Sequence, residues 1–144
     1  MSDRVVTDST CLIALKRQVF STVIAPEAVR DEVSIPIPWL DIKAPGNLAA
    51  VSALRTQLDD GEANVIALAL ELGDVLVILD DKKARRIARQ MGLLVIGTVG
   101  ILVRAKGKGV CAQVKPILDA LDNAGFRMTK SLRHEALRLA GESD

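Results

Sequence analysis

Aromatic residues are nearly absent from this chain. Among 144 residues there is no tyrosine, and the aromatic set is limited to Phe20, Trp39 and Phe126. Proteins that hold single-stranded nucleic acid by base stacking need aromatic platforms, so we do not expect recognition of that kind. The chain also lacks an apolar run of the roughly 18–20 residues that a membrane-spanning helix needs, and its first residues show no signal-peptide pattern. We therefore expect a protein without a membrane segment.

Histidine and cysteine are equally scarce. His134 is the one histidine, and its place in a predicted C-terminal helix argues against a two-histidine ribonuclease, a Ser-His-Asp triad or a zinc peptidase. We interpret it as a surface residue. Cys11 and Cys111 are far apart and belong to no CxxC motif, so neither a disulfide framework nor a cysteine-rich zinc site is indicated. The expected location is the cytoplasm.

The composition that remains is typical of one globular domain. Hydrophobic residues make up 49% of the chain and the mean hydropathy is +0.27, which excludes a disordered chain and provides enough apolar surface for one packed core. We expect a single domain over residues 1–144.

Charge is balanced in sum but not along the chain. Residues 1–81 carry 6 basic and 13 acidic side chains, whereas residues 82–144 carry 13 basic and 5 acidic ones. Between Lys82 and Lys108 there are eight lysines and arginines and no acid. Such a segment indicates either a polyanion partner or solvated helix faces, and charge alone leaves both open.

Hydrophobic patterning predicts alternating strands and helices. Strands are expected over residues 4–7, 20–25, 75–79 and 93–96, with a short edge strand at 39–43. Helices are expected over 12–15, 26–33, 48–58, 62–72, 82–91, 99–105, 114–121 and 130–140, capped by Ser9 or Thr10, Asn47 and Thr129, with Gly61 breaking the pattern. This alternation predicts a three-layer α/β/α sandwich with a mainly parallel central sheet.

Acidic side chains follow the predicted strands. Asp8 ends the first strand, Asp80 and Asp81 follow the apolar strand 75–79, and Glu62 opens the helix that precedes that strand. In parallel sheets the functional crevice lies beyond the carboxyl ends of the strands. Glu32, near the end of helix 26–33, could also reach inward. Carboxylates gathered there repel one another unless a cation neutralises them, and Mg²⁺ prefers such oxygen ligands. The pattern points to metal-dependent phosphate chemistry.

Each acid also has a plainer interpretation. Asp8 and Asp81 are well placed as helix caps. Glu62 could simply favour a helix dipole, and Glu32 could be a solvated side chain. Asp80 and Asp81 could be one cap and one exposed acid.

Four segments carry a family resemblance: residues 7–15 (TDSTCLIAL), 25–33 (APEAVRDEV), 61–63 (GEA) and 79–85 (LDDKKAR). Their order and spacing, continued through Gly97-Thr98-Val99-Gly100, resemble the PIN-domain family and, within it, the VapC-like toxin branch. The resemblance implies a PIN-like ribonuclease that depends on Mg²⁺, with Mn²⁺ as a substitute. It also implies a cognate antitoxin as a possible partner and a homodimer.

The resemblance assigns roles position by position. The implied catalytic and metal-binding acids are Asp8, Glu32, Glu62 and Asp81, with Asp80 competing with Asp81 and with Ser9 or Thr10 as hydrogen-bonding neighbours. Two departures stand out: Cys11 occupies a position where relatives have proline, and the segment between Leu15 and Phe20 is shortened. The shortened segment often contributes to antitoxin or dimer contacts in relatives.

The leading hypothesis is RNA hydrolysis by metal-activated water, with no covalent nucleophile. The RNA backbone would be held by the basic residues that follow the acidic turn: Lys82, Lys83, Arg85 and Arg86. The alternative is an inactive PIN-like module that binds nucleic acid or protein. A phosphoryl-transfer receiver and a haloacid-type phosphatase both need a second acid near Asp8, which this sequence lacks, so we discount both. Residues 106–109 (KGKG) do not match the P-loop pattern, so a nucleotide-binding P-loop is not indicated either.

Overall fold

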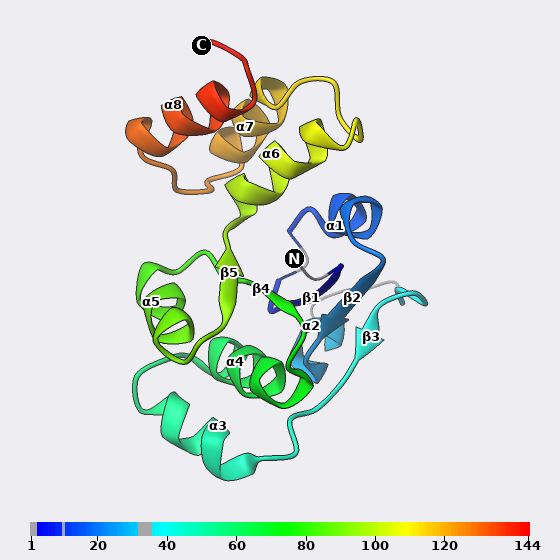
Figure 1. The fold of residues 1–144 in the computed structure, drawn as a ribbon, viewed down its shortest axis with the longest axis vertical. Coiled ribbons are helices and arrows are strands. Elements are labelled where there is room, and N and C mark those ends of the chain that lie inside the picture. Colours follow the sequence, from blue (N-terminus) through cyan, green and yellow to red (C-terminus); the bar gives the residue numbers. More distant parts are fainter. Residues whose placement is uncertain (1–2, 10, 32–35) are drawn as a thin grey trace. The chain divides into compact units, whose positions relative to one another are not determined.

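The computed structural model describes residues 3–9, 11–31 and 36–144. Two of the predicted site residues, Thr10 and Glu32, lie outside the described residues. The chain divides into two compact units, Met1–Thr98 and Val99–Asp144, and each is described by itself (Figure 1). The prediction of a single domain over residues 1–144 stays a prediction.

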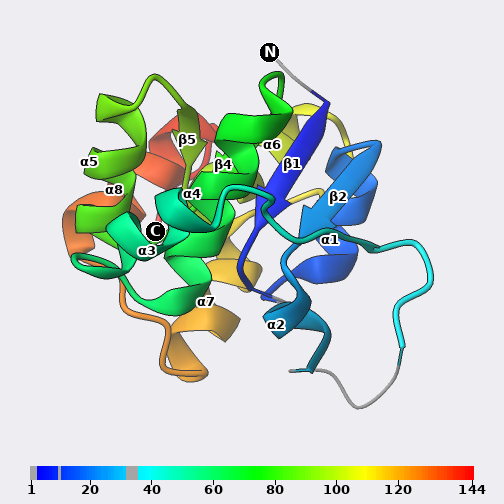
Figure 2. The ribbon, with the colours of Figure 1, turned by 90° about the horizontal axis from the view of Figure 1, so that it is seen from below.

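The first unit is built on a five-stranded parallel sheet with the strand order β3-β2-β1-β4-β5. Its strands are β1 (Arg4–Thr7), β2 (Thr22–Ala25), β3 (Asp41–Ile42), β4 (Leu76–Ile78) and β5 (Leu94–Ile96). In the central pairs, Val6 lies opposite Ile24 on one side and Val77 on the other. Figure 2 shows β2, β1, β4 and β5 side by side in this order.

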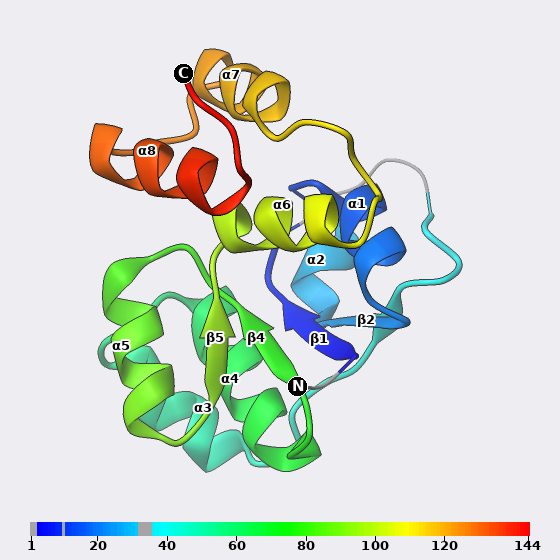
Figure 3. The same ribbon diagram turned by 45° about the horizontal axis from the view of Figure 1, so that its top comes forward.

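Helices cover both faces of this sheet. The helices of the first unit are α1 (Ile13–Val19), α2 (Glu27–Asp31), α3 (Leu48–Arg55), α4 (Asp60–Leu72) and α5 (Lys82–Gln90). The chain runs from β1 to β3 in one direction, then returns past β1 to β4 and β5. Right-handed crossovers therefore place α1 and α2 on one face and α3, α4 and α5 on the other. Figure 3 shows α5 beside β5, which it contacts, and α4 packs on β1 and β4. The predicted α/β/α sandwich is confirmed.

Burial explains why the central strands are continuous apolar runs. Val5 and Val6 of β1 and Val77 of β4 are fully buried, as expected for parallel strands covered on both faces. Helix α4 is apolar on most sides, and its residues from Val65 to Ala69 are all buried, because it lies between the sheet and α3.

Local signals at several helix ends are confirmed. Asn47 caps α3 by accepting a hydrogen bond from the Ala50 amide, and Thr129 caps helix α8 (Lys130–Leu139) by accepting one from the Leu132 amide. Gly73 follows α4 with a φ of +80°, a conformation that glycine adopts without steric cost.

Two other predictions about where helices begin are wrong. Helix α1 starts after Leu12, which has a φ of +54° and provides no side-chain cap. Ser9 instead accepts a hydrogen bond from the Cys11 amide through its Oγ. Gly61 does not break a helix, because α4 begins before it at Asp60 and Asp59 serves as its cap.

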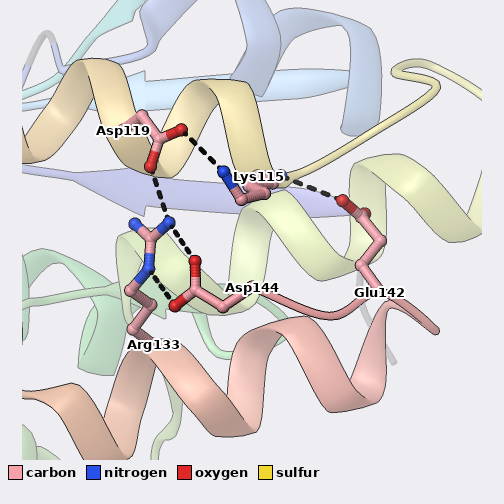
Figure 4. A network of polar contacts seen from close by, with 5 residues as sticks. All are labelled: Lys115, Asp119, Arg133, Glu142 and Asp144. Atoms are coloured by element: carbon pink, nitrogen blue, oxygen red, sulfur yellow. Dashed lines mark hydrogen bonds and ion pairs between the residues drawn. The ribbon is translucent and has the colours of Figure 1, made fainter.

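The second unit is helical. It comprises most of α6 (Thr98–Gly107), together with α7 (Lys115–Asn123) and α8 (Lys130–Leu139). Ion pairs and hydrogen bonds hold its C-terminal segment against the helices. Arg133 pairs with Asp119 at 2.6 Å and with Asp144 at 2.9 Å (Figure 4). Glu142 accepts a hydrogen bond from the Lys115 amide. None of the helices in the described residues has the length and apolar character that a membrane crossing requires.

Candidate active site

The candidate site lies at the carboxyl ends of β1 and β4. These neighbouring strands lead the chain in opposite directions, β1 toward β2 and β4 toward β5, so the strand order reverses between them. Ligand crevices of open parallel sheets form at such a reversal, outside the carboxyl ends of the strands. Asp8 follows β1 there, and Asp80 and Asp81 follow β4.

The fold raises the pKa of Asp8. Burial of its carboxyl group and the charge of Asp59 raise its pKa to about 6, and Asp80 adds to the effect. A hydrogen bond to its own backbone and the charge of Lys16 act in the opposite direction. The Asp8 carboxylate is thus partly desolvated and surrounded by more negative than positive charge.

Glu62 responds to the same group of charges. Desolvation raises its pKa to about 7, against a hydrogen bond from the Asp59 backbone amide, and the charges of Asp59, Asp81 and Asp8 raise it further. The predicted acids Asp8 and Asp81 therefore lie close enough to Glu62 to raise its pKa, as does Asp59, which was not predicted.

Helix caps hold two of these acids. The Oδ1 atom of Asp59 accepts a hydrogen bond from the Glu62 amide at 2.8 Å, and Oε1 of Glu62 accepts one from the Asp59 amide at 3.3 Å. The pair forms a capping box at the start of α4. Asp81 caps α5, its Oδ2 accepting from the Ala84 amide at 2.9 Å. The cap interpretation is confirmed for Asp81 and wrong for Asp8, because Leu12 occupies the cap position of α1.

Asp80 is held by Thr98 instead. Its Oδ1 accepts a hydrogen bond from the Thr98 amide and its Oδ2 one from the Thr98 hydroxyl, both at 2.7 Å. Thr98 is 1% exposed, whereas Asp80 is exposed, so these bonds are only partly shielded from water. They tie the end of β4 to the start of α6, and each oxygen of Asp80 accepts one hydrogen bond.

A buried lysine supports the loop that carries Asp8. Lys16 is fully buried, and its Nζ donates to the Thr7 hydroxyl and to the Ser9 carbonyl, each at 3.0 Å. These bonds clamp the residues on both sides of Asp8. Ser9 was predicted as a hydrogen-bonding neighbour, and it contributes its carbonyl to Lys16 and its hydroxyl to Cys11.

Basic side chains follow on α5. Lys82, Lys83 and Arg86 are exposed, whereas Arg85 is half-buried. A depression of about 510 Å³ on this helix is lined by Lys82, Arg85, Arg86, Arg89 and Gln90. Arg89 was not among the predicted RNA contacts. It lies four residues after Arg85, and this spacing indicates that both side chains lie on the same face of the helix.

The carboxylate oxygens of the site are suitable ligands for a hard divalent cation, although several of these side chains make hydrogen bonds elsewhere. In the described part of the chain, no three His, Cys, Asp or Glu side chains are grouped closely enough to hold a metal ion. Hydrogen bonds to the backbone and to Thr98 account for the present orientations of Glu62, Asp80 and Asp81. Carboxylate oxygens around a half-buried Asp8 are nevertheless the ligands that Mg²⁺ accepts, and a cation would relieve their repulsion.

Comparison with known proteins identifies one family. The DUF3368 family model, a PIN domain, matches residues 4–142 and so spans both compact units. No curated protein and no solved structure matches the chain. The PIN-domain part of the sequence resemblance is thereby confirmed, and the VapC-like toxin branch stays a prediction.

Proposed function

The chain belongs to the PIN-domain family, and from this premise we propose that it is an endoribonuclease that hydrolyses RNA phosphodiester bonds with Mg²⁺ or Mn²⁺. The PIN domain is a nuclease-type fold; the choice of RNA and the dependence on metal are the finer parts of the proposal.

One observation supports the proposal: carboxylates from separate segments lie near enough to one another, where the strand order reverses, to raise the pKa values of Asp8 and Glu62. The pKa values of Asp8 and Glu62 rise to about 6 and about 7, through desolvation and through the charges of Asp59, Asp80 and Asp81. A fold that gathers carboxylates at its crevice against their repulsion is typical of a cation-binding catalytic site.

Asp8, Glu62 and Asp81 would hold the metal, with Glu32 binding it directly or through water. When bound, the metal lowers the pKa of a coordinated water and stabilises charge on the phosphate. Asp81 is favoured over Asp80 as a ligand because only its Oδ2 accepts a cap hydrogen bond, whereas both oxygens of Asp80 accept hydrogen bonds from Thr98 and so have fewer lone pairs left for a metal. Lys16 keeps the Asp8 loop in place.

The basic residues of α5 would bind the RNA backbone. Lys82, Lys83, Arg85 and Arg86 follow the acidic turn directly, so phosphates held by them lie beside the acids. Binding through such side chains weakens linearly in log affinity against log salt.

The biological setting is proposed from the VapC-like resemblance alone. In that setting the protein is a cytoplasmic toxin, forms a homodimer and is held by a cognate antitoxin. A small adjacent reading frame whose product binds the purified protein and suppresses its nuclease activity would support this role.

A second candidate function is an inactive module that binds nucleic acid or protein. The hydrogen bonds of Glu62, Asp80 and Asp81 favour it, because each of these acids has a structural task at a helix start.

Incubation of structured and single-stranded RNA with the purified protein separates the two candidates. We expect cleavage with Mg²⁺ or Mn²⁺, none with EDTA, and a loss of about 10²-fold or more in Asp8→Asn and Asp81→Asn. Asp74→Asn is the matched control, since Asp74 precedes β4 at the opposite edge of the sheet. Cleavage that persists in EDTA, or in both site variants, would contradict the nuclease proposal. Salt-sensitive RNA binding without any cleavage would favour the inactive module.

A further inference from the structure

Arg85 differs from the other basic residues of α5 in where its guanidinium lies. A Cβ atom placed on Gly97 would lie 2.9 Å from Nη1 of Arg85 and 3.2 Å from Oδ1 of Asp80. The guanidinium and the Asp80 carboxylate therefore approach the same point, just beyond β5. Only the missing side chain of Gly97 leaves room for this approach.

The Arg85 side chain has no partner in the described part of the chain. Its Nε is buried and makes no hydrogen bond, and no ion pair to it is present among the described residues. Arg85 forms no ion pair with Asp80, whose two carboxylate oxygens accept hydrogen bonds from Thr98. Buried polar groups are nearly always satisfied, so this Nε–H is a donor that an incoming ligand can use.

We propose that Arg85 is the phosphate-binding residue of the site, and that it contacts the phosphate of the RNA bond that is cut. This inference rests on the proposed function for the identity of the substrate. A guanidinium offers Nε–H and Nη–H in a planar fork that matches two phosphate oxygens. Lys82, Lys83 and Arg86 are exposed and hold the flanking backbone as point charges.

Kinetics with short RNA substrates test the role of the fork. Arg85→Lys keeps the charge but removes the Nε–H donor, and we expect kcat to fall about 10²-fold, as for the loss of a transition-state donor. Arg86→Gln removes a charge from the neighbouring exposed position, and we expect it to raise KM with little change in kcat, an effect that low salt reverses. Equal losses of kcat in the two variants would overturn the proposal.

A spectroscopic measurement tests the contact without cleavage. The Arg85 Nε–H resonance, assigned by its absence in Arg85→Lys, is followed in the full chain with EDTA present. We expect it to shift on addition of RNA, and more weakly with inorganic phosphate, but not with chloride at the same ionic strength. A resonance that saturating RNA leaves unchanged overturns the inference even if the protein cleaves RNA. If no RNA is cleaved but the resonance shifts, the phosphate site stands and the proposed nuclease activity falls.

Discussion

At the scale of single residues, the buried carboxylate of Asp8 opposes the stability of its own fold. Burial and the charge of Asp59 raise its pKa to about 6, above the value of 3.8 that is ordinary for aspartate. The positive charge of Lys16 lowers the Asp8 pKa and so offsets part of this increase. Lys16 also holds the loop in place through hydrogen bonds to Thr7 and Ser9. Functional residues often carry such a cost in free energy.

Replacement of Asp8 by asparagine should therefore stabilise the metal-free protein. The folded-state pKa of about 6 lies above the unfolded value of 3.8, so the charged form destabilises the folded state increasingly as the pH rises between these values, and fully above about 6. We expect Asp8→Asn to raise the free energy of unfolding by about 1–2 kcal/mol at pH 8, discounted for partial exposure. The gain should shrink as the pH falls from 6 toward 4. Urea denaturation at several pH values measures both effects.

Asp122→Asn provides the matched control for this change, because Asp122 is an exposed carboxylate of the second unit. Its free energy of unfolding should follow that of the wild type across the same pH range. A metal-free Asp8→Asn protein that is less stable than the wild type at pH 8 would contradict the assignment of Asp8 as a destabilising charge.

At the scale of elements, two glycines near the site differ in what surrounds them. A Cβ on Gly61 would meet Asp59 Oδ1 and Asp8 Cβ at 3.7 Å, which is ordinary contact. Gly61 is the second residue of α4, where glycine costs less than the roughly 0.5–1 kcal/mol that it costs in the middle of a helix. Gly61→Ala should thus raise the free energy of unfolding by up to about 0.5 kcal/mol.

Gly97→Ala should act in the opposite direction. The added Cβ would lie 2.9 Å from Nη1 of Arg85 and 3.2 Å from Oδ1 of Asp80, so the guanidinium must move. Because Nη1 is the end of a flexible side chain, we expect a loss smaller than the roughly 1–3 kcal/mol of core overpacking, together with a change in the Arg85 Nε–H resonance. Thermal unfolding of the two variants side by side checks the contrast, and equal stability of both would refute it.

The sequence predicted the features that local patterns control. The apolar strands and the caps at Asn47 and Thr129 need only neighbouring residues, and they are confirmed. Asp59 was missed although Asp59 and Glu62 have the spacing of a capping box, because Gly61 between them was interpreted as a helix breaker. The cost of one glycine is smaller than the gain from that box and from the buried face of α4.

Long-range contacts were beyond the reach of sequence patterns. No local signal distinguishes Lys16 from an exposed lysine, because its burial depends on α1 packing against β2. The bonds between Asp80 and Thr98 join residues 18 positions apart, and only the register of β4 and β5 brings these residues together.

At the scale of the whole molecule, the charge division of the sequence does not follow the division into units. Residues 1–81 carry a net negative charge, and residues 82–144 carry a net positive charge. Residues 1–98 instead contain 11 basic and 13 acidic side chains, and residues 99–144 contain 8 and 5. Because α5 belongs to the first unit, this one unit carries both the acidic cluster and the basic residues proposed to bind RNA.

Acid should destabilise the second unit through Glu142. Hydrogen bonds from the Val114 amide, Lys106 Nζ and the Lys115 amide lower its pKa to about 2. A depressed folded-state pKa gives stability that is present above the unfolded value of about 4.5 and is lost as the pH falls toward 2. Glu142→Gln should therefore lower the thermal midpoint at pH 7 and leave little difference at pH 2, as checked by calorimetry. A variant as stable as the wild type at pH 7 would refute this role.

Metal binding should couple the site to the stability of the molecule, and this stabilisation should also increase with pH. Mg²⁺ must displace protons from Asp8 and Glu62, whose pKa values are about 6 and about 7. We therefore expect Mg²⁺ to raise the thermal midpoint strongly at pH 8 and weakly at pH 5. The ceiling at pH 8 is about 2.7 kcal/mol when Mg²⁺ reaches 100 times its Kd. Asp74→Asn should keep the full shift, whereas Asp8→Asn, although more stable without metal, should lose it. An equal Mg²⁺ shift at both pH values, or an unchanged shift in Asp8→Asn, would place the cation elsewhere on the protein.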